Sequence, residues 1–482
     1  MVARQDLTLI EPYVYEIPSS YRDDMRVPAR LYADESILEM ALGDRSIEQL
    51  INTATLPGIQ AHALAMPDVH QGYGFPIGGV VATALPSGVI SPGGVGYDIN
   101  CGVRLITSPL RAEEVRQRID ALMDALYAKV PVGVGEAGGL RLSKGDLRQV
   151  LEQGARWPIS RGYGLPADAE HTEDDGCMAA ARATSVSPRA LERGADQLGT
   201  LGSGNHFLEV DAITEIYDQA AAQALGLYVG QACVWVHCGS RGFGHQVCTD
   251  AVRAMQQSVA RFNITLPDRE LACAPFDSPE GQRYFEAMAC AANYAWANRQ
   301  VITHQVRQSF EQVFGRGAGE ALRVVYDVCH NVAKVEKHAV DGKVRELCVH
   351  RKGATRAFGP GHPDVPAAYR AVGQPVLIPG NMATGSYVLV GAEGAMKATF
   401  GSACHGAGRT MSRAGARRSV RGQDLRAQLE RQNIVVRAAS MAGLAEEAPD
   451  AYKDVDSIVE VVHQADIARK VARTRPLGVM KG

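Results

Sequence analysis

The chain shows two kinds of apolar pattern, namely residues that recur at helical spacing and short continuous runs. Helical spacing is clearest from Glu113 to Val130 and recurs from Leu147 to Leu151 and from Ile213 to Leu227, which predicts amphipathic helices that pack on a core. Gln246–Phe262 and Pro279–Phe314 are also predicted to be helical, and the second is long enough for a hairpin of two helices.

Short apolar runs lead into polar loops at three points. QACVWVH ends at His237 before the glycine-rich CGSRGFGH, LRVVYDVCHN carries His330 at its end, and PVLIP precedes the turn GNMATGS. Such β-prone runs predict buried strands that direct polar groups into loops. The glycine-rich segment from Met66 to Arg104 predicts tight turns and short strands, and Pro166–Asp175 predicts an exposed acidic loop.

The order of these elements favours one α+β domain over residues 1–482, because strands and helices alternate irregularly without a repeat or a low-complexity linker. Apolar residues make up 46% of the chain and charged residues 21%, as in soluble globular proteins. The N-terminal segment MVARQDLTLIEPYVYEIP lacks the pattern of an export signal, and no apolar run reaches about 18 residues. We therefore expect a cytoplasmic protein with no transmembrane helix.

Charge and cysteine content narrow the picture further. A formal net charge of −3 gives no global reason to bind nucleic acid, so any anionic partner must be held by a local patch. Ten cysteines in 482 residues are too sparse for a disulfide scaffold and are expected to stay reduced. Six of them have no polar motif beside them and are predicted to be core residues: Cys177, Cys233, Cys248, Cys273, Cys290 and Cys348.

The segment GYDINCG places a carboxylate, Asp98, and a thiol, Cys101, in one glycine-rich turn. Both side chains could converge on a divalent metal ion, and a buried cysteine beside a turn-capping aspartate is the alternative. The chain lacks the local C-x-x-C pairs of structural zinc sites, which favours a catalytic site assembled from distant segments. Four histidines in glycine-, serine- or asparagine-framed turns are the candidate partners: His206, His237, His330 and His405.

The segment GSACHGAGRTMSR is typical of a phosphate-binding loop, because small residues let backbone amides approach an oxyanion that Arg409 and Arg413 can pair with. His405 near its centre could be a metal ligand, a general base or a nucleophile that forms a phosphoramidate. From Arg409 to Arg426 six arginines accompany one acid, Asp424. This run predicts either a phosphate-binding patch or a solvated helix face.

Taken together, these segments resemble the RtcB family of RNA ligases. The resemblance runs from about Met66 to Gly482 and rests on MPDVHQGYGFPIGG, GVGYDINCGVR, LGSGNHFLEV, HCGSRGFGH, DVCHN, FGSACHGAGR and RPLGVMKG. It implies a single large α+β domain with mixed β-sheets surrounded by helices around a central metal cleft. It also implies an enzyme of tRNA splicing or RNA repair that uses GTP to join RNA 3′-phosphate or 2′,3′-cyclic phosphate ends to 5′-hydroxyl ends. RNA and an archease-type activating protein are the implied partners.

The resemblance further implies residue roles. His405 would attack the α-phosphate of GTP, and the guanylyl group would then pass to an RNA 3′-phosphate before a 5′-hydroxyl displaces GMP. Two Mn²⁺ ions would share the thiolate of Cys101, one also bound by Asp98 and His206 and the other by His237 and His330. The implied GTP contacts are Asn205, Glu209, Asn381, Ser386, His405, Gly406, Ala407, Gly408, Tyr452 and Lys481, and the implied RNA-phosphate contacts are Arg193, Arg241 and Arg413.

One segment departs from the family pattern. PGNMATGSY has Asn381 where Ser or Asp is common and Ala383 where Gly is common, so a paralogue with a different guanine or RNA-end preference stays open. An alternative enzyme is a metal-dependent phosphoesterase that hydrolyses RNA ends without a nucleotide. A non-catalytic RNA-binding protein is disfavoured, because all five implied ligands and His405 are present.

Overall fold

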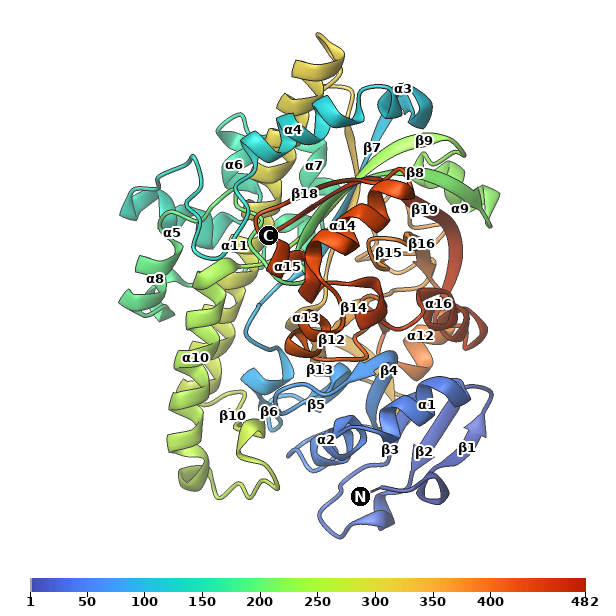
Figure 1. Cartoon of the computed structure of the whole chain (residues 1–482). Coiled ribbons are helices and arrows are strands. Elements are labelled where there is room, and N and C mark those ends of the chain that lie inside the picture. The colour runs from blue at the N-terminus through green and yellow to red at the C-terminus, as the bar shows by residue number, and fades with distance from the viewer. Residues whose placement is uncertain (1) are drawn as a thin grey trace.

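Two large β-sheets form the centre of the computed structural model, which describes residues 2–482 (Figure 1). In sheet order, the seven-stranded sheet contains β1 (Thr8–Glu11), β2 (Val14–Ile17), β3 (Ala29–Tyr32), β4 (Ala63–His70), β5 (Ile77–Ala84), β13 (Lys343–Lys352) and β12 (Asn331–Val340). The eight-stranded sheet contains β11 (Arg323–Cys329), β7 (Gly102–Arg111), β9 (Gln231–Cys238), β8 (Phe207–Ile216), β19 (Ala468–Lys481), β16 (Ser386–Gly391) and β15 (Pro375–Ile378), with β18 (Val435–Ala438) paired to β19.

Two short ladders and sixteen α-helices complete the fold within the described residues. The ladders pair β6 (Val89–Ile90) with β10 (Ala274–Pro275) and β14 (Ala354–Arg356) with β17 (Ser402–Cys404). The helices are α1 (Glu35–Leu42), α2 (Ser46–Thr53), α3 (Ala112–Arg116), α4 (Ile119–Lys129), α5 (Lys144–Gln153), α6 (Arg156–Ser160), α7 (Pro166–Glu170), α8 (Pro188–Gly194), α9 (Gln219–Leu225), α10 (Arg241–Ser258), α11 (Pro279–Phe314), α12 (Glu393–Ala398), α13 (Arg413–Ser419), α14 (Gly422–Arg431), α15 (Met441–Glu446) and α16 (Val455–Gln464). This arrangement is the expected α+β fold with mixed sheets.

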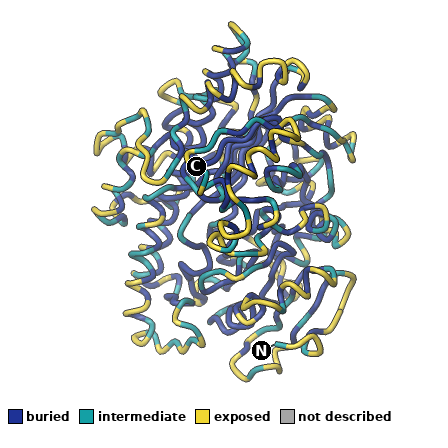
Figure 2. Tube along the Cα trace, in the orientation of Figure 1, coloured by how far each residue is buried: buried dark blue, intermediate teal, exposed yellow. Residues whose placement is uncertain are grey.

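Side chains along β9 alternate between the two faces of the eight-stranded sheet, and this alternation decides the face from which His237 projects. Val234 and Val236 belong to the core that the sheet shares with α4 and α11, whereas Trp235 belongs to the core on the other face. His237 is two residues beyond Trp235 and therefore projects from that second face. The central strands are buried throughout, as the dark tube in Figure 2 shows. The predicted strand QACVWVH is confirmed.

The segment Pro279–Phe314 forms a single helix, α11, of 36 residues, and the predicted possibility of a helical hairpin is wrong. Its length of about 54 Å, at 1.5 Å per residue, takes it along the whole core. The Ser278 side chain caps its first turn and Gly315 ends it, and no proline interrupts it after the first position. Several polar residues near its middle are buried, among them Asn298 and Arg299. These polar side chains hydrogen-bond to loops that are described in the next section.

Two further predictions need correction. Residues 213–216 complete strand β8, so only Gln219–Leu225 of the predicted helix Ile213–Leu227 is helical. The segment Pro166–Asp175 contains helix α7 and the start of a 3₁₀ turn rather than an exposed loop. Its acids Asp168 and Glu173 are buried because basic residues from distant elements pair with them, and local sequence cannot show such partners.

The other expected elements are present with shifted ends. The stretch Glu113–Val130 is split into α3 and α4, the short helical pattern Leu147–Leu151 lies within α5, and α10 begins five residues before Gln246. Met66–Arg104 contains short strands and turns. All ten cysteines are unpaired; of the six predicted core cysteines, five are buried and Cys177 is partly exposed. In residues 2–482, every helix is too short or too polar to cross a membrane.

Candidate metal centre and active site

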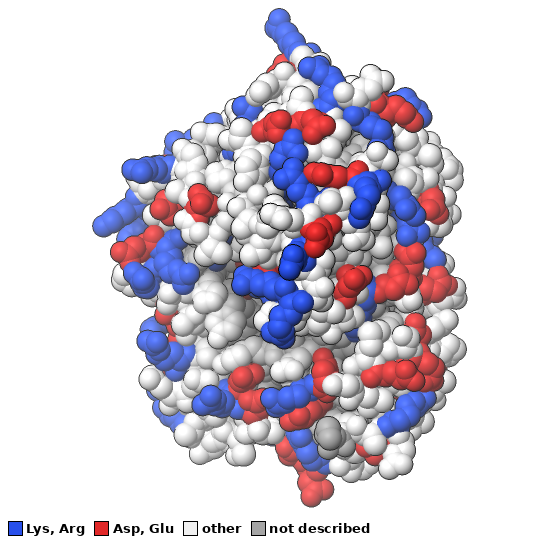
Figure 3. Space-filling model, viewed as in Figure 1, with Lys and Arg blue, Asp and Glu red and all other residues white. Residues whose placement is uncertain are grey.

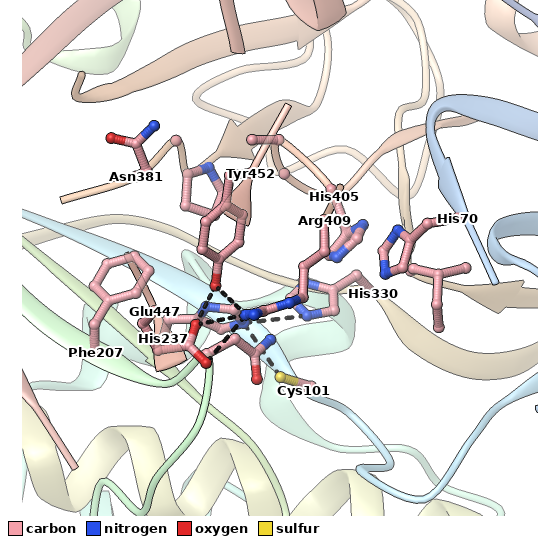
Figure 4. Close-up of a pocket in the computed structure, with 18 of the residues that line it drawn as sticks. His70, Cys101, Phe207, His237, His330, Asn381, His405, Arg409, Glu447 and Tyr452 are labelled. Atoms are coloured by element: carbon pink, nitrogen blue, oxygen red, sulfur yellow. Dashed lines mark hydrogen bonds and ion pairs between the residues drawn. The ribbon is translucent and has the colours of Figure 1, made fainter. Parts of the chain in front are cut away.

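A pocket of about 230 Å³ lies between the two large sheets and collects most of the predicted site residues (Figure 4). Strand ends and loops from both sheets contribute to its lining, from His70 of β4 to Lys481 of β19. The predicted residues that line it are Asp98, Cys101, Asn205, Glu209, His237, His330, Asn381, His405, Gly406, Ala407, Gly408, Arg413, Tyr452 and Lys481.

Two groups of potential metal ligands share the thiol of Cys101. Its Sγ lies 3.3 Å from Nε2 of His206 and 3.2 Å from Nε2 of His237. His206 Nε2 lies 2.7 Å from Asp98 Oδ2, and His237 Nε2 lies 3.3 Å from His330 Nε2. Within each group, Asp98–Cys101–His206 and Cys101–His237–His330, the ligand atoms lie within 4.8 Å of one another. The five side chains named from the sequence therefore form one cluster.

A buried arginine of α11 holds the backbone from which these ligands extend. The Arg299 guanidinium donates to the carbonyls of Asn100 and Cys238 at 2.9 and 2.6 Å, and to the Asn100 side-chain oxygen at 2.8 Å. It also forms a two-point ion pair with Asp327, which Arg104 shares from the other side. Asn100 has a positive φ of 50°, so the loop before Cys101 needs such support.

The electrostatics of the cluster suit a cation. Burial opposes ionisation of Asp98, but the adjacent His206 holds the pKa of this carboxyl at about 2. Burial lowers the pKa of His237 and His330 well below the ordinary value, so both imidazoles are neutral. Burial and the Asp98 charge raise the pKa of the Cys101 thiol, which therefore keeps its proton unless a cation displaces it. Neutral imidazoles, one carboxylate and one thiol are a donor set that fits divalent metals.

His405 lies beside this cluster, with its ring centroid 4.8 Å from that of His330. It follows the short strand β17, and its imidazole Nδ1 lies 2.5 Å from Oδ2 of Asp68, a fully buried residue of β4. The same oxygen accepts the backbone N–H of His405 at 2.9 Å. Since Nδ1 donates to a carboxylate, Nε2 carries the free lone pair. Gly353 packs against the ring: a Cβ there would lie 3.2 Å from His405 Cε1 and 2.4 Å from Ile77.

A second polar group in the pocket is built around Glu447 (Figure 4). Arg409 Nη1 lies 3.2 Å from both carboxylate oxygens and 3.2 Å from the hydroxyl of Tyr452, which itself donates to Glu447. Lys481 Nζ is 3.9 Å from the same carboxylate. Burial and the neighbouring Asp211 raise the pKa of Glu209 well above its usual range. This part of the pocket offers donors and acceptors in a largely dry setting.

Four predicted residues lie outside the pocket lining: His206 of the ligand cluster, Ser386, Arg193 and Arg241. The Ser386 hydroxyl is buried and accepts the backbone N–H of Gly380, so it supports the turn rather than facing the cavity. Arg241 Nη1 lies 3.3 Å from His206 Nδ1, behind the ligand cluster, and Arg193 donates to Gln246. In the divergent turn PGNMATGSY, the side-chain oxygen of Asn381 accepts the N–H groups of residues 383 and 384, which closes the turn locally.

The arginine run is less positive than the sequence indicates. Arg409 and Arg413 pair with Glu447, and Arg417 pairs with Glu446, so two acids at the C-terminal end of α15 neutralise half of the six arginines. The ion pairs of the described residues leave Arg418 and Arg421 without an acid. Lys and Arg side chains nevertheless gather over α13 beside a hollow in the viewed face (Figure 3).

The sequence interpretation did not single out Asp68, His70 and Glu447, which line or support the pocket. Asp68 and His70 belong to the quoted motif MPDVHQGYGFPIGG, where polar residues inside an apolar strand were the available signal. His70 donates to the Asp68 carbonyl at 3.0 Å, and burial lowers its pKa to about 4. Glu447 lies in the unremarkable segment GLAEEAPD, and no local signal marks it.

The fold and the site define an α+β protein with a candidate metal centre next to a histidine held by a carboxylate. Residues 49–482 match the family model described as tRNA-splicing ligase RtcB. The chain is 56% identical to the tRNA-splicing ligase RtcB of Thermococcus kodakarensis over 477 residues, 99% of each protein. It is 53% identical to the RNA-splicing ligase RtcB of Mycobacterium tuberculosis over 437 residues, 90% of this chain and 100% of that relative. The chain belongs to the RtcB family.

Proposed function

We propose that this protein is an RNA ligase that joins 3′-phosphate or 2′,3′-cyclic phosphate ends of RNA to 5′-hydroxyl ends. It would use GTP and Mn²⁺ and pass through a guanylylated His405. The observation that carries this proposal is the position of the His405 imidazole, which is bonded to buried Asp68 and lies beside the ligand cluster in the pocket that Glu447 also lines. Family membership supports RNA as the substrate.

The bonding of His405 suits it to act as a nucleophile. Its Nε2 lone pair would attack the α-phosphorus of GTP, the P–N bond would form as the bond to the β-phosphate oxygen breaks, and pyrophosphate would leave. Nδ1 keeps its proton, so positive charge develops on the ring as the bond forms. The Asp68 carboxylate is placed to stabilise that charge, much as a buried aspartate orients a catalytic histidine elsewhere.

Asp98, Cys101, His206, His237 and His330 would hold two Mn²⁺ ions. When bound, such ions neutralise the charge that builds up on phosphoryl oxygens. The chain itself contributes the fixed geometry: Arg299 holds the loop of Cys101, and the Leu201 carbonyl lies 3.1 Å from His206 Nδ1, which directs Nε2 toward the cluster. Nitrogen and sulfur ligands also bind zinc, so metal supply would decide occupancy.

The remaining roles follow the pocket and its rim. The guanine nucleotide would contact the backbone of residues 406–408 and five side chains of the pocket, namely those of Asn205, Glu209, Asn381, Tyr452 and Lys481. The Ala407 N–H already donates to the Pro379 carbonyl at 3.1 Å, so this amide supports the loop. Arg193, Arg241 and Arg413 would contact RNA phosphates. The guanylyl group would pass to the RNA 3′-phosphate, and attack by the 5′-hydroxyl would release GMP.

Incubation with α-labelled GTP and Mn²⁺ tests the proposal directly. We expect an acid-labile, alkali-stable adduct on the wild-type protein and none on His405→Ala. His463→Ala, which alters a histidine of α16 outside the pocket, is the matched control. A phosphoesterase would release phosphate from RNA ends without GTP and without an adduct, and that result would reject the ligase.

The metal assignment has its own test. Cys101→Ala removes the atom shared by both ligand groups, so we expect Mn²⁺ binding and strand joining to be lost together. Cys233→Ala changes a buried cysteine on the same sheet away from the cluster and serves as the control for folding. Unchanged joining by Cys101→Ala in the presence of Mn²⁺ would reject the metal assignment.

A further inference from the structure

Three aromatic rings, those of Tyr73, Tyr97 and His245, form a contiguous group outside the pocket lining, next to Asp98 in the sequence. The ring centroids of Tyr97 and His245 are 4.9 Å apart with an interplanar angle of 31°, and those of Tyr73 and Tyr97 are 5.5 Å apart, edge to face. Tyr73 and Tyr97 are partly exposed and His245 is exposed. None of the three lines the pocket that holds His405. Their rings are therefore available to a molecule outside the nucleotide site.

This aromatic group adjoins the ligand cluster directly. Tyr97 immediately precedes Asp98 in sequence, and His245 is one helical turn after Arg241, which lies 3.3 Å from His206. Burial lowers the pKa of His245, and the charges of Arg193 and Asp98 act on it in opposite directions, so His245 lies within electrostatic reach of both.

The rings of Tyr73 and Tyr97 are also fixed by contacts with buried residues. The buried ammonium of Lys352 donates to the Tyr73 carbonyl and lies 5.9 Å from the Tyr73 ring centroid. The N–H of the next residue, Gly74, donates to the Glu270 carboxylate at 2.9 Å. Tyr73 and Tyr97 pack with their inner surfaces against the core beside α10 and α11. A surface fixed in this way binds a flat ligand with little further loss of side-chain entropy.

We propose that Tyr97 and His245, with Tyr73 behind them, form a stacking platform for an unpaired nucleobase next to the RNA end that is being joined. Unpaired bases of RNA are commonly held by stacking on aromatic rings, and the contact tolerates any base because each has a π-face. The neighbouring Arg193 and Arg241 supply positive charge for the phosphates on either side of that base. This inference rests on the proposed ligase function and makes the three residues positioning residues.

The test compares RNA substrates with and without the base. Tyr97→Ala and His245→Ala are assayed for joining of short RNAs whose terminal nucleotide, on the 3′-phosphate side or the 5′-hydroxyl side, is normal or abasic. With normal RNA we expect the KM to rise about 5- to 150-fold, the range for loss of one stacked base, with a smaller change in kcat. With the abasic nucleotide at the stacked position, wild type and variants should have the same KM. Tyr97→Phe keeps the ring and should behave as wild type.

Two further measurements separate the possible outcomes. A 2-aminopurine at the stacked position should lose fluorescence on binding wild type and keep it on binding Tyr97→Ala, and this readout does not need ligation. Formation of the GTP adduct is measured in parallel, so that a wild-type protein without an adduct refutes the proposed function and leaves the fluorescence test to decide on the platform. Tyr127→Ala, which alters an exposed tyrosine on α4, is the control. An equal KM penalty on normal and abasic RNA at both ends would overturn the platform.

Discussion

Asp68→Asn provides the sharpest test of how His405 is activated. The substitution keeps the size of the side chain and an oxygen that can accept from both the imidazole and the backbone N–H of His405. It removes the negative charge. If Asp68 stabilises the positive charge that develops on the ring during attack on GTP, adduct formation should slow while the fold and metal binding persist.

The expected size follows from the geometry. A charge-assisted hydrogen bond contributes about 1.5–3 kcal/mol, against about 1 kcal/mol for a neutral one. Two unit charges about 4 Å apart interact by about 4 kcal/mol at an effective dielectric constant of about 20. Asp68 is fully buried and its oxygen lies 2.5 Å from Nδ1, so we expect a loss of about 2–4 kcal/mol. That loss corresponds to an adduct rate about 30- to 1,000-fold lower.

Rapid-quench measurement of adduct formation with labelled GTP gives the rate, and calorimetry gives the Mn²⁺ affinity. Transfer of GMP from a preformed adduct to RNA should not slow, because removing the Asp68 charge destabilises the histidine–GMP intermediate and makes the imidazole a better leaving group. An adduct rate within about threefold of wild type would refute the role of Asp68. A parallel fall in Mn²⁺ affinity would show that Asp68 acts through the metal centre instead.

Three more predictions concern the frame of the site. Gly353→Ala should slow adduct formation and destabilise the fold by about 1–3 kcal/mol, because the added Cβ would press on Ile77 and His405. Gly361 also has a positive φ but lies in open space, so Gly361→Ala should leave the adduct rate unchanged. Arg299→Met should lower the free energy of unfolding, measured by chemical denaturation, by about 3–5 kcal/mol and should also weaken Mn²⁺ binding. Arg104 pairs with the same aspartate but does not contact the ligand loop, so Arg104→Met should lower the stability alone. Burial raises the pKa of Asp211 from 3.8 to about 7. Between these two values the unfolded chain releases this proton and the native state keeps it, so the free energy of unfolding, relative to that of Asp211→Asn, should fall by up to about 4 kcal/mol as pH rises from about 4 to 7. Above pH 7 the difference should stay constant. Denaturation at pH 4, 5.5 and 7.5 would contradict this sign if the difference were flat or reversed.

Local pattern marked four histidines as candidate metal-binding residues because they sit in turns framed by glycine, serine or asparagine, whereas the ligand set itself was implied by the family resemblance. His237 and His330 end buried strands, and their alternation with apolar neighbours fixes the face on which they project. Their meeting with Cys101 depends on strand order in the eight-stranded sheet, where β7 lies between β9 and β11. Such long-range pairing leaves no trace in a single sequence, so the resemblance to a family, rather than periodicity, joined the separate motifs into one site.

The residues that sequence reasoning missed share a physical character, since each is a charge balanced by a partner far along the chain. Asp68 meets His405 across 337 positions, and Glu447 neutralises arginines that look unopposed in the run after the phosphate loop. Pairing of this kind inverts what local composition implies: Asp168 and Glu173 of the acidic segment Pro166–Asp175 become buried, and the arginine run loses half of its positive charge.

The same reasoning explains why α11 carries polar residues at buried positions. A helix of 36 residues inside a core could be stabilised by apolar packing alone, and buried ion pairs contribute little net stability. Arg299 instead joins Asn100, Cys238 and Asp327, which belong to the loop of Cys101 and to the ends of two ligand-bearing strands. Arg299 thus fixes the relative position of three chain segments, although burying its guanidinium costs desolvation energy. The fixed position keeps Sγ of Cys101 at 3.3 Å from Nε2 of His206 and at 3.2 Å from Nε2 of His237 at once, which is the geometry that the proposed metal centre needs.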